Sequence, residues 1–254
     1  MGTVADKISA AIDSKAAMQA AMLSGNFYTP LGDVLSAWPN DIRHVNISGD
    51  LQEYQFYMRF GGKGQTAAQR QSSVPFQPQI TDVSIDFDHT TFPYNSLFYA
   101  FVNLTSLSGV PKYMKPRARK ITSQPGGFLA YAFAYCTGIS GDISVDLTEA
   151  CDTNGTLNSN VAQSMFAYCT GLSGATLIYP NTLTGTSIIN YTPQMFNACS
   201  GLKWAVVHGL SADPKYSSSG ANTTFSGCNG LTSIEYTDVT QAYGSASTGD
   251  YSSG

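Results

Sequence analysis

The chain has 254 residues, of which 43% are apolar, so it can bury a core without disulfide cross-links and is not a disordered polymer. Only 12% are charged and the net charge is -4, which argues against general nucleic-acid binding because that requires a basic surface. No apolar run approaches the roughly 18 residues of a transmembrane helix, and the start lacks the features of a secretory signal peptide, so we expect no membrane insertion and no signal peptide at this start.

Residues 1–44 are expected to hold two helices. Thr3 and Asp6 form an approximate capping box, and apolar residues then recur at helical spacing to residue 23. Thr29 and Pro30 begin a second, short helix, because proline is favoured at the first helical position. Two short helices bury little by themselves. We therefore expect residues 1–44 to be an attachment and oligomerisation segment.

Residues 45–79 are expected to be a β-strand region followed by a linker. Val45 and Ile47 alternate with polar residues, and the stretch from Tyr54 to Phe60 alternates in the same way. The glycines at 61–64 interrupt this pattern without the spacing of a phosphate-binding loop.

From residue 80 to residue 240 the chain repeats itself. Five segments align on the template F-x-x-C-x-x-L, and the spacings between their Phe positions are 35, 33, 30 and 29 residues, as in stacked repeat proteins. The first copy carries Phe101 in the Cys slot. The aligned positions are Phe98, Phe133, Cys136, Phe166, Cys169, Phe196, Cys199, Phe225 and Cys228.

A short β-prone run follows each copy, so each repeat is interpreted as a helical turn, a tight glycine turn and a strand. One repeat cannot cover its own apolar face, and stacked copies bury a continuous core. The expected fold class is α+β: a right-handed solenoid with a parallel strand ladder and short helical turns, preceded by the N-terminal helices. Phe and Cys should form two internal columns. Residues 241–254 are expected to be a flexible Ser/Gly-rich tail.

This pattern resembles the BspA-like leucine-rich repeats, whose units read approximately aromatic-x-x-C-x-x-L-x-x-I. The resemblance covers residues 80–240, nearly two-thirds of the chain. It implies a leucine-rich-repeat-like solenoid used for surface adhesion and recognition, without shared catalytic residues.

The front of the chain carries a second resemblance. The alanine-rich run at 10–21, together with Thr29-Pro30-Leu31 and the stretch 38–42, looks like the N-terminal segments of tail and head fibre proteins of gut bacteriophages. It implies a virion protein attached to other virion proteins through residues 1–44, facing a host-surface glycan or protein. We expect a homo-oligomer, with a trimer favoured over a dimer. The alternative is a cellular BspA-like adhesin on the bacterial surface.

The residue patterns favour no catalytic, cofactor or metal site. His44, His89 and His208 lie in no recognisable catalytic arrangement, and Asp86 with Asp88 is better explained as a solvated strand end than as a cation site. The five cysteines include no CxxC pair. We therefore expect a non-enzymatic protein, with Cys151 as the most exposed thiol.

One basic stretch remains as a candidate binding segment for an acidic partner. Its residues are Lys112, Tyr113, Lys115, Arg117, Arg119 and Lys120. The alternative is a solvated insertion loop. Exposed tyrosines are a second candidate, because aromatic rings can stack on sugars, although half or more of them can belong to the core.

Overall fold

The computed structural model describes residues 43–51, 56, 60–61, 75, 77–93, 95–118, 127–151, 157, 160–180, 194–209 and 224–237. The expected helices of residues 1–42, the tail 241–254, and Arg119 and Lys120 of the basic segment lie outside these residues.

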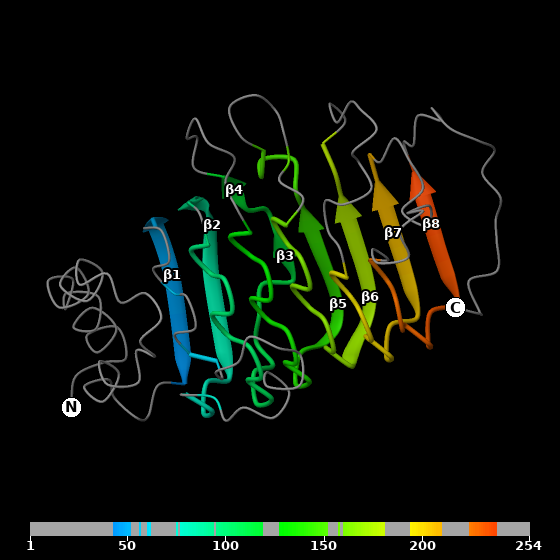
Figure 1. The fold of residues 1–254 in the computed structure, drawn as a ribbon, viewed down its shortest axis with the longest axis horizontal. Helices are drawn as coiled ribbons and strands as arrows, with labels where there is room; N and C mark the ends of the chain where they lie inside the picture. Colours follow the sequence, from blue (N-terminus) through cyan, green and yellow to red (C-terminus); the bar gives the residue numbers. More distant parts are fainter. Residues whose placement is uncertain are drawn as a thin grey trace, which may run out of the picture.

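The described residues form parallel strands that follow one another along the molecule (Figure 1). The strands are β1 His44–Asp50, β2 Asp82–Phe92, β3 Tyr113–Met114, β4 Arg117–Ala118, β5 Ser140–Asp146, β6 Gly171–Ile178, β7 Trp204–His208 and β8 Ser233–Thr237. They make a three-stranded sheet in the order β1-β2-β4 and a five-stranded sheet in the order β3-β5-β6-β7-β8, with every pairing parallel. The parallel strand ladder is therefore confirmed.

The segments expected to be helical turns are not helices, and the described residues contain no helix. Alternate backbone N–H groups instead donate to the next repeat: those of Phe133 and Tyr135 bond the carbonyls of Met165 and Ala167 at 2.9 and 2.7 Å. The residues two positions before and two positions after Phe133 take positive φ: Tyr131 at 56° and Tyr135 at 62°. These left-handed residues turn the intervening N–H groups toward the neighbouring repeat, so the turns form a second ladder of hydrogen bonds.

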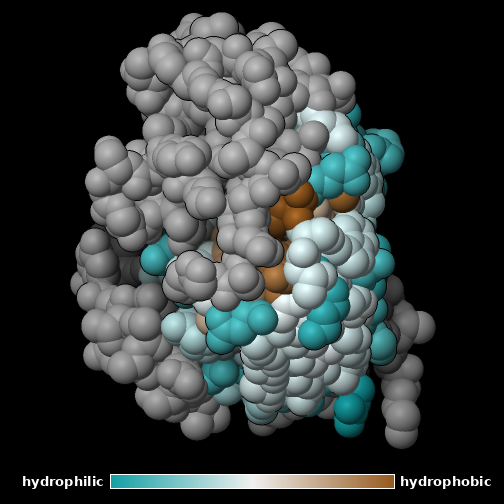
Figure 2. Space-filling view, turned by 90° about the vertical axis from the view of Figure 1, so that its right-hand side faces the viewer, coloured by the Kyte–Doolittle hydropathy of each residue, from teal (hydrophilic) through white to brown (hydrophobic). Residues whose placement is uncertain are grey.

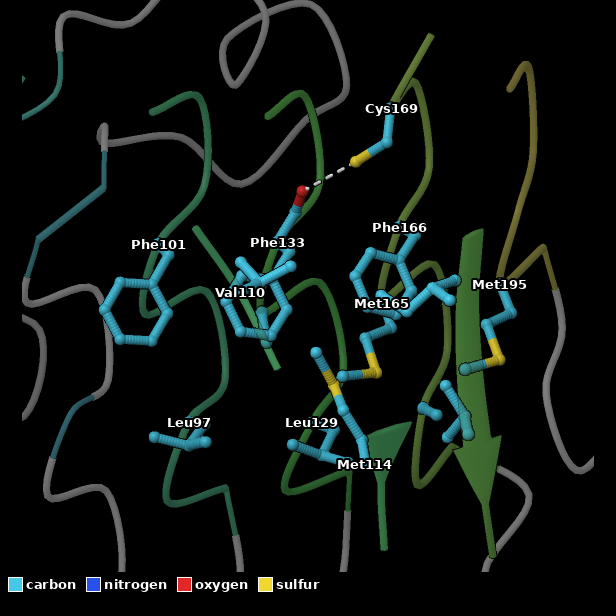
Figure 3. Close-up of a cluster of buried hydrophobic side chains, with 14 of the residues drawn as sticks. Leu97, Phe101, Val110, Met114, Leu129, Phe133, Met165, Phe166, Cys169 and Met195 are labelled. Carbon is cyan, nitrogen blue, oxygen red and sulfur yellow. Dashed lines mark hydrogen bonds between the residues drawn. The ribbon is translucent and has the colours of Figure 1, made fainter. Parts of the chain in front are cut away.

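One column of stacked phenylalanine rings runs through the core (Figure 3). Neighbouring ring centroids lie 5.1–5.7 Å apart and the interplanar angles are 4–9°. The rings belong to Phe60, Phe101, Phe133, Phe166, Phe196 and Phe225. The first copy of the template was therefore aligned wrongly: Phe101 is its column ring, Leu104 stands in the Cys slot and Leu107 in the Leu slot.

Phe98 lies outside this column. It is half-buried and packs edge-on against Tyr99 and Tyr131, with centroids 4.3 and 6.0 Å away. The turn at residues 97–101 directs Phe101 into the core and Phe98 to the opposite side, where a smaller apolar cluster forms. The stacked pairs Tyr99–Tyr131 and Tyr135–Tyr168 belong to the same cluster.

The four repeat cysteines form a column of their own beside the phenylalanine rings. Each thiol donates to the carbonyl of the column Phe in the preceding repeat, as Cys169 does to Phe133 at 3.1 Å (Figure 3). The equivalent bonds of Cys136, Cys199 and Cys228 measure 3.0, 3.1 and 3.0 Å. A small side chain with one donor suits this slot, because it fills the space and joins two repeats.

The repeat stack includes residues before 80. β1 pairs with β2, and the backbone N–H of Phe60 donates to the carbonyl of Ala100 while its ring stacks on Phe101. The strand expected at residues 54–60 is wrong at the two positions described there, because Phe56 and Phe60 lie in turns that bond the neighbouring turn segment. Two aromatic residues four positions apart face the core on that path, with rings 6.0 Å apart.

Residues 109–118 divide the strands into two sheets. Gly109 pairs with Asp82, Tyr113–Met114 pairs with β5, and Arg117–Ala118 pairs with β2. Pro111 and Pro116 stand at the two changes of partner. Proline has no backbone N–H and interrupts a continuous ladder, so this segment alternates between the sheets instead of forming one long strand.

Candidate recognition surface

The described part of the basic segment lies at the junction of the two sheets, and two of its three charges are paired with a carboxylate. Lys115 Nζ lies 3.0 Å from Oε1 of Glu149, and Arg117 Nε lies 2.8 Å from Oε2 of the same carboxylate. The ammonium of Lys112 donates to the carbonyl of Ser140. These residues have a structural use that their sequence cluster did not reveal, because Glu149 is more than 30 positions away from both.

Asp146 is the buried member of this junction. Its carboxylate accepts the hydroxyl of Tyr113 at 2.7 Å and the backbone N–H of Thr148 at 2.9 Å, and its side chain is 9% exposed. Burial raises the pKa of Asp146, but hydrogen bonds from Thr148 and Tyr113 outweigh it and hold the pKa below the ordinary value. The hydrogen bond from Lys115 likewise lowers the pKa of Glu149. Both acids are therefore stabilised in their charged forms.

The column cysteines are placed for packing. Burial raises the pKa of Cys136 to about 12 and that of Cys228 to about 11, and it also raises the pKa of Cys169 and Cys199. No disulfide joins any of the five cysteines. A thiol that stays protonated is a poor nucleophile and metal ligand, so these side chains serve the core. Cys151 is half-buried.

The remaining candidates from the sequence do not gather into one site. The ring of His89 contacts the carboxylate of Asp86 at 2.9 Å on the surface, and His208 bonds Thr237. Within the described ranges, no three His, Cys, Asp or Glu side chains are grouped as metal ligands would be. Of the tyrosines, Tyr99, Tyr135 and Tyr179 are buried and Tyr131 and Tyr168 are half-buried. In the part of the chain described here, no helix is long and apolar enough to cross a bilayer.

The outward face of the five-stranded sheet brings side chains of four repeats into register. Inward positions such as Val145, Leu177 and Val207 are buried, and the residues between them point the other way. Three rows cross the strands from β5 to β8. They are Asp142–Gly174–Trp204–Ser233, Ser144–Thr176–Val206–Glu235 and Asp146–Ile178–His208–Thr237.

The first row contains an unusually close approach. A Cβ at Gly174 would lie 2.2 Å from Cε2 and Cζ2 of Trp204 and 2.7 Å from Oδ1 of Asp142. The indole therefore occupies the space above Gly174 and reaches toward the carboxylate two strands away. Asp142 is exposed and accepts the hydroxyl of Ser173 at 2.7 Å. Sequence reasoning missed this group; the available signal was a glycine in the strand position that Asp142 and Trp204 hold in the adjacent repeats.

The end of the stack that carries β8 differs from its middle. Phe225, Leu231 and Ile234 are only partly buried, whereas their counterparts in the preceding repeat are buried. Viewed from that end, the described surface is mostly pale or hydrophilic, with a smaller hydrophobic area near its centre (Figure 2).

Comparison with known proteins gives no relative for this chain. No family model, curated protein or solved structure matches it.

Proposed function

We propose that the protein is a non-enzymatic recognition protein of the bacteriophage head- or tail-fibre type, which presents a leucine-rich-repeat-like solenoid to the host surface. The observation that carries the proposal is the outward sheet face, on which four successive repeats place side chains in aligned rows. Such a face is an array of binding positions, because each repeat contributes one residue to each row. The two resemblances in the sequence supply the class of protein.

The core is suited to hold that face in place. The stacked rings, the thiol bonds and the turn ladder each connect one repeat to the next, so neighbouring strands have little freedom to slide. A fixed surface binds with less loss of conformational entropy than a mobile one. The 12% charge content also suits a partner recognised by hydrogen bonds and stacking more than by strong charge.

Residues 1–44 are the proposed attachment and oligomerisation segment in this arrangement. A homo-oligomer, with a trimer favoured, would place several recognition faces on one particle. Several weak contacts then give strong binding through avidity.

The experiment is a truncation that removes residues 1–42. The cut must spare Arg43, because its carbonyl accepts the N–H groups of Thr81 and Asp82 at 2.9 and 3.1 Å. The truncated chain should be a folded monomer by light scattering, should fail to join particles, and should still bind host cells weakly. A truncation that keeps the full-length oligomeric state would remove residues 1–42 from the assembly role. If the full-length chain is found in the cell envelope and not in purified particles, the cellular adhesin is the correct class.

A further inference from the structure

We propose that Trp204, Asp142 and Ser173, arranged around Gly174, form a binding site for a neutral pyranose sugar. The inference deepens the recognition role proposed above and rests on it only for the biological source of the sugar. The site lies at the beginning of β5, β6 and β7 on the outward face, where three repeats meet.

The packing around Gly174 fixes the position of the indole. Any side chain at position 174 would overlap the six-membered ring of Trp204, since even a Cβ would come within 2.2 Å of two of its carbons. Gly174 has no positive φ, so its use here is to provide space and not an unusual backbone conformation. Trp204 is held against the β6 backbone and remains partly exposed to solvent. An aromatic ring held in this way is a ready surface for the C–H face of a pyranose.

The polar partners stand beside that ring. Oδ1 of Asp142 and the indole both approach the same point above Gly174, so a sugar packed on the exposed part of the indole has its hydroxyls near the carboxylate. Asp142 is a strong acceptor for hydroxyl protons, and the Ser173 hydroxyl that it orients still has lone pairs to accept another. Ring stacking and directed hydroxyl contacts together are what recognition of a single pyranose requires.

The charges select a neutral sugar over an acidic one. Asp142 would repel a uronate or sialate carboxylate at short range. Lys115 and Arg117 are paired with Glu149 at the sheet junction, and the Lys112 ammonium is bonded to the carbonyl of Ser140. The same pairing argues against Lys115 and Arg117 as the main site for an acidic glycan.

The test uses the fluorescence of Trp204. The chain has two tryptophans, Trp38 and Trp204, so Trp38→Phe in the full-length protein leaves one reporter. This variant is titrated with the methyl pyranosides of glucose, galactose, mannose and N-acetylglucosamine and with methyl glucuronide, and it is also applied to a glycan array. We expect a saturable change in Trp204 emission with at least one neutral pyranoside, at millimolar midpoint, and a weaker response to the glucuronide.

Two substitutions and one matched control locate the site. Asp142→Asn should raise the midpoint about tenfold or more, as for loss of a hydrogen bond to a charged group. Gly174→Ala should weaken binding similarly because it displaces the indole. Glu235→Gln removes an exposed carboxylate from the same face two strands beyond β6 and should leave the midpoint unchanged. Circular dichroism and urea unfolding check that each variant is folded.

The possible failures of the two proposals are distinguishable. The sugar site is overturned if no pyranoside and no glycan on the array binds, or if Asp142→Asn and Gly174→Ala both leave the observed binding unchanged. It is also overturned if Glu235→Gln weakens binding as much as these two substitutions do. Failure of these sugar tests with host-cell binding retained would overturn the sugar site and leave the recognition role intact. Sugar binding by a chain that never occurs in particles would leave the site standing and refute the fibre role.

Discussion

Replacing Phe101 with alanine should be far more destabilising than replacing Phe98, although the two residues are of the same type and lie in one turn. Phe101 is fully buried and stacks on Phe60 at 5.1 Å and on Phe133 at 5.3 Å, with nearly parallel rings. Phe98 is half-buried and touches two tyrosines by its edges. Only Phe101 is part of the column that joins successive repeats.

The magnitudes follow from burial. Truncation of a fully buried phenylalanine to alanine costs about 3–5 kcal/mol, and the loss of two stacked neighbours places Phe101 toward the upper part of that range. A half-buried ring at the edge of a smaller cluster should cost about 1–2 kcal/mol, because less area is removed from contact and solvent can fill the space. The expected difference is therefore at least about 2 kcal/mol.

Urea unfolding followed by circular dichroism measures both free energies. The slope of each transition must also be compared, because a repeat stack that separates into two unfolding units gives a reduced slope. Phe101→Leu is a useful third variant, since it keeps most of the apolar volume and removes the stacking. Equal or larger destabilisation by Phe98→Ala would refute the assignment of Phe101 to the column.

Three further predictions concern the repeats and the sheet junction. Gly201→Ala should lower the free energy of unfolding in urea by about 2 kcal/mol or more, because its Cβ would lie 2.1 Å from the carbonyl oxygen of Thr170 in the preceding repeat. Gly49→Ala should lower it by only about 1–2 kcal/mol, because Gly49 has open space around it and only its φ of 87° opposes a side chain. The reverse order of the two costs would contradict the close-packing argument. A thiol reagent at pH 8 should modify Cys151 first in the folded protein and should modify Cys136, Cys169 and Cys199 only after unfolding. Burial keeps these three thiols protonated and covers them. Equal modification rates for all five cysteines would show that the reagent reaches the cysteine column in the folded protein. The folded-state pKa values of Asp146 and Glu149 lie below their ordinary values, so the stability that these two acids contribute is present above about pH 5 and is lost as the pH falls through the folded pKa values. Asp146→Asn should therefore make the free energy of unfolding depend less on pH on the acid side. An unchanged pH profile would mean that Asp146 is not stabilised in its charged form.

Several strands are predictable from the sequence because their signal is local. The β-prone runs at 143–147 and 234–236 alternate apolar and polar residues and lie in β5, except for Leu147, and in β8. The apolar run at 205–207 lies within β7, whereas the β-prone run at 107–110 contributes only the bridge between Gly109 and Asp82. Periodicity could not distinguish a helical turn from the turns observed, because the repeat Phe and the Cys three positions later, such as Phe133 and Cys136, face the core in both. The difference lies in where the N–H groups bond, and those partners belong to the next repeat.

The misaligned first repeat has a different cause. Its segment contains phenylalanine at both 98 and 101 and has no cysteine, so the template fits in two registers. Only the stacking of Phe101 between Phe60 and Phe133 selects one of them. The corrected spacing from Phe101 to Phe133 is 32 residues, which is closer to the other repeats than the 35 residues counted from Phe98.

The surface was the least predictable part, because its meaning depends on lateral neighbours. The basic stretch reads as a charge cluster until Asp146 and Glu149 are brought beside it. Gly174 and Trp204 are 30 positions apart and carry no local signal, yet strand register makes them neighbours. In a stacked repeat, the core positions are dictated by the period, whereas each outward row combines one residue from every repeat. Once register is known, comparison along a row shows the place where a glycine stands between an aspartate and a tryptophan, Asp142–Gly174–Trp204.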